Sequence, residues 1–396
     1  MTMAAAIESR TAAPPCLRTD RIARVDIFHD LGQVATMWRG LEDQQHLSTP
    51  FQRFDFLTSW QRQVGQREKL QPFIVVAYDG EHRPLLLLPL ALRHRHGIRT
   101  ACFMGGKHAT FNMALWHRDF AASATVADLT TLVSAISARR RADVLALHQQ
   151  PLRWRDLPNP LALLPHQPSV NDCPLLTMAP GAEPTTLVSN SFRRRLKGKE
   201  RKLQALPGYR YHVAATDSDI IRLVDWFFRI KPLRMAEQKL PNVFAEAGVE
   251  EFIRSACIAR LATGGRAINI HALECDDEVI AIFAGVADAQ RYSMMFNTYT
   301  MSDHSRHSPG LVLIRDIIDD YARQGYRALD LGIGSDDYKR QFCKSDEPVF
   351  DSFIPVSPRG KLAATAMSGI NRAKYLVKHN PRLFNLAQRL RSALHR

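Results

Sequence analysis

The 396-residue sequence lacks several features that mark secreted or membrane-spanning proteins. Its six cysteines, at positions 16, 102, 173, 257, 275 and 343, are scattered, and none forms a Cys-x-x-Cys pair. Single thiols of this kind argue against a disulfide framework and against a zinc site, so we expect no metal. No apolar run approaches the ~20 residues that cross a bilayer, and Met1–Asp20 lacks the apolar core of a secretory signal. We therefore predict a cytoplasmic protein in which residues 1–22 form a flexible leader.

Acidic residues are also in short supply, because 39 Asp and Glu stand against 53 Lys and Arg, which gives a formal net charge of +14. Such an excess attracts polyanions, namely nucleic acid, anionic membranes, nucleotide sugars or coenzyme A. The densest basic run, Arg193–Lys202, holds seven cations and one acid. It has neither interleaved aromatic residues nor a base-reading module, so nucleic acid is not the partner that we expect. A solvated helix face and an arm that closes over phosphates both stay open.

One stretch, residues 306–342, has the pattern of a ligand-binding unit. Ser308, Pro309 and Gly310 lead into an amphipathic run that stops at Gly325. Ser308 suits an N-cap, Pro309 the first helical position, and Gly325 the position just past the end. The predicted helix would begin with free backbone N–H groups, and its dipole would favour a phosphate there. An ordinary capped helix is the alternative.

The neighbours of this helix carry a family resemblance. The β-rich runs that precede it and the elements that follow it are, in order, Ala267–Glu274, Val279–Ala287, Arg291–Tyr299, then a strand at Leu329, a helix at Tyr338 and a strand at Val349–Pro355. This order resembles the acyl-CoA transferase fold of the GNAT superfamily. The motifs Ser308-Pro309-Gly310, Asp330-Leu331-Gly332 and Tyr338-Lys339 resemble, more narrowly, the CelD/BcsL-type acetyltransferases of cellulose and exopolysaccharide synthesis, within the FemAB-like double-GNAT group. The superfamily's glycine-rich pyrophosphate loop is absent, because Gly310 stands nearly alone.

The resemblance implies a set of site residues. Acetyl-CoA would be the co-substrate, with no tightly bound cofactor, since a thioester is already activated. Its pyrophosphate would meet Arg306, His307, Ser308 and Gly310, and its thioester the backbone of Phe296, Asn297 and Thr298. Tyr338 would protonate the leaving thiolate, and Asp330 is either the base or a structural acid. An anionic or sugar-like acceptor would meet Lys339 and, after a helix at Ile220–Ile230, Lys231 and Arg234; surface charge is the alternative for these three cations.

The first half repeats the plan in looser form. Its predicted elements are Phe73–Tyr78, Pro84–Arg93, Ala101–Met104, a helix at Ala121–Arg140 and a strand at Asp143–His148. It has no counterpart of Ser308-Pro309-Gly310, and Gly105-Gly106-Lys107-His108 is interpreted as a turn or an anion site. We predict an α/β protein (α+β mixed sheet) of two tandem GNAT-like domains, the first degenerate. The domains span 23–178 and 179–358, with a proline-rich crossover and a basic helical tail at 359–396.

Three functions are compatible with these patterns. The first is acyl-CoA-dependent transfer, in the simplest case acetyl transfer to a sugar or an amine in exopolysaccharide or cellulose biosynthesis. The second is FemAB-like aminoacyl transfer from tRNA to a cell-wall precursor, and the third is a non-catalytic assembly factor of a polysaccharide synthase. The tail would pack on its own domain, touch the inner membrane surface or dock on such a synthase.

Overall fold

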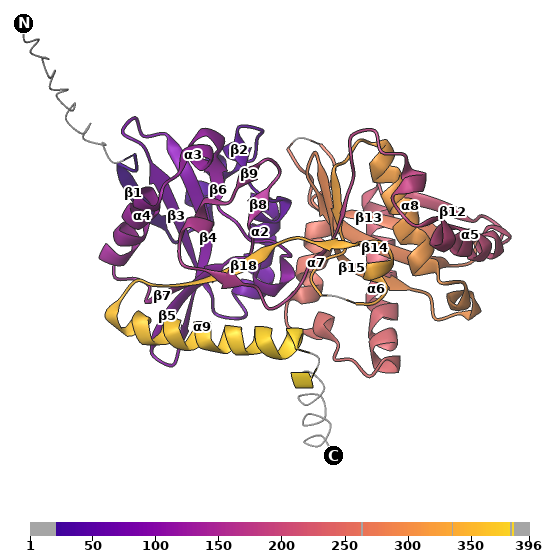
Figure 1. Ribbon diagram of the computed structural model, residues 1–396. Helices are drawn as coiled ribbons and strands as arrows, with labels where there is room; N and C mark the ends of the chain where they lie inside the picture. The colour runs from indigo at the N-terminus through magenta and orange to yellow at the C-terminus, as the bar shows by residue number, and fades with distance from the viewer. Residues whose placement is uncertain (1–20, 263, 335, 381, 384–396) are drawn as a thin grey trace, which may run out of the picture.

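The computed structural model describes residues 21–262, 264–334, 336–380 and 382–383. Nearly all of the expected leader, and the tail from 384 on, lie outside these residues. The chain forms two lobes that lie side by side, each built on a mixed β-sheet with helices against it (Figure 1). The central strands are apolar on both faces, as at Leu86–Leu88 and Ile280–Ile282, and these side chains are buried. Such continuous apolar runs are expected of strands covered on both sides.

The first sheet has the strand order β1-β3-β4-β5-β7-β18-β10, with β2 and β6 attached beside β4. Its strands are β1 (Arg24–Phe28), β2 (His46–Leu47), β3 (Gln71–Tyr78), β4 (Pro84–Arg95), β5 (Ile98–Phe103), β6 (Leu115–His117), β7 (Val144–Pro151), β10 (Gln167–Pro168) and β18 (Val349–Pro355). β5 and β7 are parallel, and they pair only from Thr100↔Val144 to Cys102↔Ala146. A small hairpin, β8 (Arg153–Trp154) and β9 (Leu157–Pro158), stands apart.

The second sheet has the strand order β12-β13-β14-β15-β16-β11-β17. Its strands are β11 (Pro174–Thr177), β12 (Arg210–Val213), β13 (Asn269–Glu274), β14 (Val279–Ala287), β15 (Arg291–Tyr299), β16 (Ala328–Asp330) and β17 (Ser345–Asp346). β13, β14 and β15 form the antiparallel meander that the sequence predicts, and β16 joins β15 in parallel.

The two lobes exchange strands. The predicted strand at Val349–Pro355 forms as β18, but it pairs with β7 and β10 of the first sheet instead of closing the second. β11, from the proline-rich segment that we expected to be a crossover, pairs with β16 and β17 in the second sheet. Each sheet is thus completed from the other half of the chain, and the division at residue 178 remains a prediction.

The helices are α1 (Leu31–Gly40), α2 (Phe54–Trp60), α3 (Arg118–Ser123), α4 (Val126–Ala138), α5 (Asn190–Gln204), α6 (Asp217–Glu237), α7 (Val249–Ile258), α8 (Pro309–Arg323) and α9 (Pro358–His379). The helix expected over Ala121–Arg140 is two helices, because Thr125 and Asp128 form a capping box that starts α4 afresh. α6 does not end at Ile230 but continues through Pro232. Within the described residues, no helix has the length and apolarity needed to cross a membrane.

The lobes share one apolar interior. The ring centroids of Phe56 in α2 and Phe252 in α7 lie 5.2 Å apart, and both side chains are fully buried. At the edge of this contact, Arg67 of the first lobe pairs with Glu251 of the second at 2.9 Å. A buried aromatic contact with polar groups around it fixes the position of one lobe against the other.

Candidate active site

A cavity opens where two parallel strands of the second sheet part. β15 pairs with β16 only over its first three residues, Arg291–Ser293. β16 then ends at Asp330, whereas β15 runs on to Tyr299. From Met294 onward, the edge of β15 that faces β16 has no strand partner in the part of the chain described. Its N–H and C=O groups are therefore available to a ligand.

This cavity has a volume of about 670 Å³ and receives residues from both lobes. Seven of the predicted site residues line it, namely Phe296, Asn297, Thr298, Lys231, Arg234, Tyr338 and Lys339. Five do not, namely Asp330, Arg306, His307, Ser308 and Gly310. The first lobe contributes Lys107, His108 and Thr110, which we did not predict as site residues.

The tip of α8 differs from the tip that the sequence predicts. Ser308 stands at the N-cap position, but its backbone is left-handed (φ 51°) and its side chain does not cap the helix. Its hydroxyl instead accepts a hydrogen bond from Lys199 Nζ at 2.5 Å. The N–H groups of Leu311 and Val312 both donate to the Ser308 carbonyl, and Pro309 has no N–H. Of the first-turn amides, Gly310 alone is left to meet a phosphate.

Cationic side chains supply the positive charge at the α8 tip that the few free amides do not. Lys199 and Lys202 of α5 and Arg306 gather at the α8 tip beside His307, whose pKa is lowered by burial and by these neighbouring cations. α5 is held against α8 by the ion pair of Glu200 with Arg315, at 2.7 Å. Lys199, Lys202 and Arg306 have no acidic partner among the described residues. Cations without a counter-ion around a helix N-terminus create a strong anion site.

Tyr338 lies at the cavity wall next to β15. Burial raises the pKa of its phenol well above the usual value, and a side-chain hydrogen bond with Asn297 offsets part of the rise. The phenol therefore stays protonated over the physiological range and has a proton to donate, although the raised pKa also makes it a weaker acid. Its helix is a single 3-10 turn, Lys339–Gln341.

Lys231 and Arg234 occupy the last turns of α6 and form the cationic side of the cavity. Burial, and then the charge of Arg234, lower the pKa of Lys231. The Arg234 guanidinium lies 3.5 Å from the ring centroid of Tyr299 and donates to the Thr300 carbonyl at 3.2 Å. The same Tyr299 ring lies 3.5 Å from where a Cβ on Gly310 would sit, so Tyr299 connects the cavity to the α8 tip.

Lys339 is engaged by the backbone. Its Nζ donates to the carbonyls of Gly332, Ile333 and Gly334 at 3.2, 3.0 and 2.9 Å. An ammonium group has three donors, so these contacts satisfy it. Lys339 thus fixes the loop after β16, and its charge is not on the surface, because the residue is 4% exposed.

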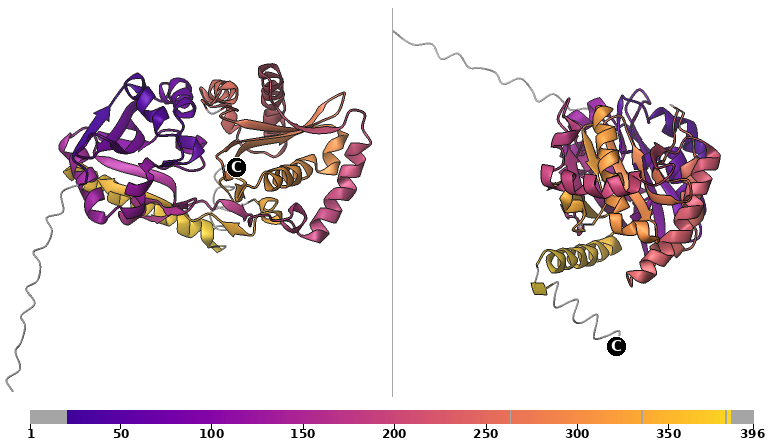
Figure 2. Two further views of the ribbon diagram at one scale, coloured as in Figure 1. Left: turned by 90° about the horizontal axis from the view of Figure 1, so that it is seen from above. Right: turned by 90° about the vertical axis from the view of Figure 1, so that its right-hand side faces the viewer.

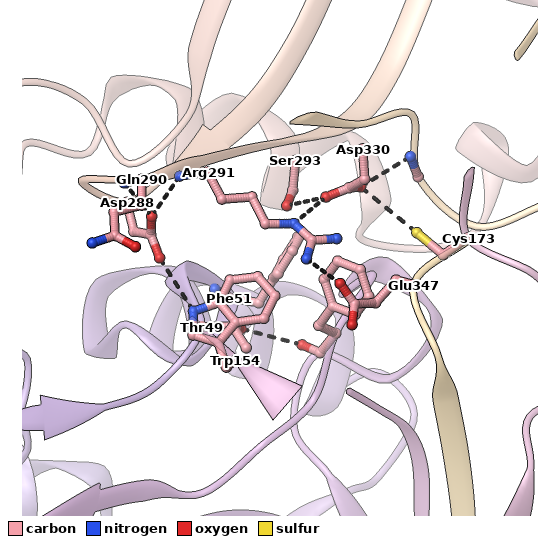
Figure 3. Close-up of polar contacts among 12 residues, drawn as sticks. Thr49, Phe51, Trp154, Cys173, Asp288, Gln290, Arg291, Ser293, Asp330 and Glu347 are labelled. Atoms are coloured by element: carbon pink, nitrogen blue, oxygen red, sulfur yellow. Dashed lines mark hydrogen bonds and ion pairs between the residues drawn. The ribbon is translucent and has the colours of Figure 1, made fainter. Parts of the chain in front are cut away.

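Asp330 does not line the cavity but belongs to a buried polar cluster (Figure 3). Its carboxylate accepts from Arg291 Nε at 2.9 Å, from Ser293 Oγ at 2.5 Å and from the Gly332 amide at 3.1 Å. Arg291 also pairs with Glu347 at 2.5 Å. The Arg291 guanidinium packs over two first-lobe rings, those of Phe111 and Trp154, 4.5 and 4.7 Å from their centroids. This carboxylate holds β15, β16 and the lobe interface together and does not reach the cavity.

His108 is the site residue that sequence reasoning missed most clearly, because the Gly105–His108 run is interpreted from the sequence as a turn, with an anion site as the alternative. Its Nδ1 accepts from Trp60 Nε1 at 3.1 Å, so the proton lies on Nε2. That buried Nε2 has no partner in the described residues. Burial and the charge of Lys107 lower the pKa of His108 to about 4. A second cavity of about 880 Å³, in the first lobe, shares Lys107 and His108 with the first.

Comparison with known proteins agrees with this geometry. Residues 190–340 match a family described as "Acetyltransferase (GNAT) domain". Among solved structures, a conserved protein of unknown function from Bacteroides thetaiotaomicron is similar, with 10% identity over 84% of this chain and 100% of that chain and a TM-score of 0.53. The C-terminal domain of a putative lysylphosphatidylglycerol synthetase from Agrobacterium fabrum has 11% identity over 86% and 97%, with a TM-score of 0.50. FemX has 7% identity over 81% and 100%, with a TM-score of 0.50.

These findings establish a class. The structural likenesses show a shared fold, and the family match shows that the second half carries a GNAT acetyltransferase domain. The chain is an enzyme of the acyltransferase class that uses acyl-CoA as co-substrate and is built on two GNAT-like lobes, as predicted. Among curated proteins, none matches the sequence.

Proposed function

We propose that this enzyme transfers an acyl group, acetyl in the simplest case, from acyl-CoA to an anionic or sugar-like acceptor. One observation carries the proposal: the uncompensated cations Lys199, Lys202 and Arg306 lie at the tip of α8, which Tyr299 connects to the open edge of β15. A diphosphate at the tip would place its thioester along that edge. The narrower CelD/BcsL assignment, in cellulose or exopolysaccharide synthesis, rests on the motif resemblance.

The residues divide the chemistry as follows. Backbone N–H groups of Phe296–Thr298 polarise the thioester carbonyl, which is the oxyanion-type contribution. Tyr338 gives its proton to the leaving thiolate. Lys231 and Arg234 hold the acceptor, and His108 donates to it from Nε2. Holding the acceptor against the carbonyl supplies most of the rate, because the thioester is already activated.

The base that takes the proton of the acceptor has to be a carboxylate other than Asp330. Asp330 is fully buried and ion-paired, so we assign it to positioning. Asp336 is the carboxylate among the described residues that line the cavity, and its oxygen lies 3.8 Å from Lys339 Nζ. We propose Asp336 as the base. Lys339 shapes the loop that presents it.

Isothermal titration with coenzyme A tests the proposal. Wild-type protein should bind one coenzyme A, and Gly310→Trp should abolish binding, because the indole would fill the space between the α8 tip and Tyr299. Lys197→Glu, on the same basic helix as Lys199 but with no contact to the tip, is the control and should bind normally. Absence of binding by the wild type at millimolar ligand contradicts the proposal.

Aminoacyl transfer from tRNA is the second candidate, since Arg194, Arg195 and Arg201 give α5 an exposed basic surface without acidic partners in the described chain. α5 is only 15 residues long and is pinned to α8. We therefore rank it below acyl-CoA. Salt-dependent retention of tRNA, with no coenzyme A binding, would reverse the order.

A place at the inner membrane surface or on a polysaccharide synthase belongs to the proposal as well, because the basic helix α9 lies on the outside of the first lobe.

A further inference from the structure

In the part of the chain that is described, the outer face of α9 is apolar and exposed. Among the described residues, the three large apolar side chains with the greatest exposure are Leu362 (79%), Leu376 (60%) and Ile370 (57%), and all three belong to this helix. Ala366, Gly369 and Ala373 lie between them at the i, i+4, i+7 spacing of one helix face. We call the set Leu362, Ala366, Gly369, Ala373 and Leu376 the outer stripe; Ile370 lies at its edge, where it also lines the cavity of about 880 Å³ in the first lobe.

The opposite face of α9 explains why the stripe points outward. Gly360, Ala364 and Asn371 are buried against the first sheet. A Cβ on Gly360 would lie 1.7 Å from the Asp143 carbonyl, so the helix sits directly on the backbone at this point. Farther along, Lys378 Nζ donates to Asn171 Oδ1 at 2.7 Å. With its inner side fixed, the helix runs along the lower edge of the first lobe in Figure 1, and Figure 2 shows it from above and from the side.

Charge around the stripe has one sign. From Pro358 to the end of the sequence there is no Asp or Glu. The described cations of this segment are Arg359, Lys361, Arg372, Lys374, Lys378 and Arg382. None of them forms an ion pair within the described residues. On the helix, Lys361 and Arg372 lie to one side of the outer stripe and Lys374 to the other, whereas Lys378 lies on the inner side and Arg382 lies beyond the helix end.

We propose that α9 docks this protein onto the surface of a bilayer containing anionic lipids, with the outer stripe inserted at the level of the headgroups. A helix that is apolar on one side, cationic at its flanks and free of acids binds such surfaces through buried apolar area and attraction to anionic lipid. A second copy of the chain fits poorly, because stacking two stripes would bring like charges together. The stripe is narrow, with Ala and Gly between its large residues, which suits shallow insertion more than a protein groove.

Vesicle flotation of the full-length protein tests this docking. The probes are phosphatidylcholine vesicles with and without phosphatidylglycerol. We expect binding only to the anionic vesicles, weakened by added salt because flanking charges are screened. The double variant Leu362→Ser with Leu376→Ser should lower the partition coefficient at least about tenfold, because two buried leucines are lost from the lipid contact.

The matched control is Val126→Ser with Ile221→Ser, which removes apolar side chains of comparable exposure (56% and 48%) from other helices. It should float as the wild type does. Thermal unfolding and coenzyme A titration should be unchanged in both double variants, which separates docking from folding and from catalysis. Equal binding to neutral vesicles, no binding, or binding that survives the Leu362/Leu376 change would overturn the proposal. So would a wild-type dimer that those two substitutions dissociate.

Discussion

The two lobes place the same pair of parallel strands in different chemical surroundings. β5 and β7 of the first lobe, like β15 and β16 of the second, pair over three residues and then part. The pair that ends the register is Cys102↔Ala146 in the first lobe and Ser293↔Asp330 in the second. The first lobe therefore keeps the scaffold without the polar cluster that fixes its opening.

The helices that precede β7 and β16, α4 and α8, also differ in the charge around their N-termini. At the start of α4, the carboxylate of Asp128 accepts from the Thr125 backbone and lies 3.5 Å from Arg21, so an acid of the chain itself fills the helix tip. At the start of α8, by contrast, Lys199, Lys202 and Arg306 gather, and they have no acidic partner among the residues that the structure describes. The proposed anion site of the second lobe therefore depends on a few side chains at a helix tip, and the strands alone would not create it.

The largest effect on stability should come from replacing Asp330, at the end of β16, by an uncharged residue, since the matching position of the first lobe is uncharged. Asp330→Asn leaves Arg291 and Glu347 in a buried cluster with one partner neutralised, and should lower the free energy of unfolding by about 3 kcal/mol. Chemical denaturation measures it. Asp336→Asn is the matched control: it should leave stability unchanged and lower kcat. If Asp330→Asn lost kcat at full stability, Asp330 would be the base after all.

The next effect concerns the helix tips. Lys199→Glu with Lys202→Glu should weaken coenzyme A binding about 10–100-fold, because charge-assisted contacts to phosphate are lost. Titration calorimetry measures the change, with Lys197→Glu as the control. If the two substitutions lowered the rate of acetyl transfer but left the affinity for coenzyme A unchanged, these lysines would contact the acceptor instead.

The pH dependence of stability should not set the lobes apart, because burial also lowers the pKa of His108 in the first lobe, to about 4. His271 of β13 is buried, and burial lowers its pKa to about 3 from 6.5. Below pH 6.5 the unfolded chain binds a proton at this histidine, whereas the folded chain does so only near pH 3. The free energy of unfolding is therefore highest above pH 6.5 and falls as the pH drops toward 3. At pH 5 this histidine should reduce the free energy of unfolding by about 2 kcal/mol. Thermal unfolding of His271→Gln should show a smaller drop from pH 7 to pH 5; an equal drop would assign the effect elsewhere.

The smallest effect is expected at the first-lobe tip. Asp128→Asn removes half of the capping box of α4 and should cost about 1 kcal/mol. It frees the tip of its acid but adds no cations, so the stoichiometry of coenzyme A binding should stay at one. A second bound coenzyme A would mean that the carboxylate alone had blocked the first lobe.

Sequence patterns predicted the fold where period and turn signals agree. The meander strands β14 and β15 have the predicted bounds, and α8 begins at Pro309 and ends just before Gly325, whose φ of 79° suits the turn there. The break at Thr125 and the continuation of α6 through Pro232 were missed because capping and tertiary packing override average preferences.

The site was harder to predict from the sequence. Neither the left-handed backbone of Ser308 nor the arrival of Lys199 from α5 has a local signature. The exchange of β18 and β11 could not be foreseen either, since each is a short apolar run that would fit the edge of either sheet. For Asp330, the sequence left a base and a structural acid open, and for Lys339 an acceptor contact and a surface charge, because a charge in a sequence does not show what it faces.

That exchange has a consequence for how the protein can be divided. The residues that match the acetyltransferase family end at 340, before β18, and begin at 190, after β11. Cutting the chain at these limits would remove β18 from β7 and β11 from β16. Both pieces would then expose unpaired backbone N–H and C=O groups along a strand edge. The two tandem lobes are interlocked by this exchange, so we expect them to unfold and to be degraded together.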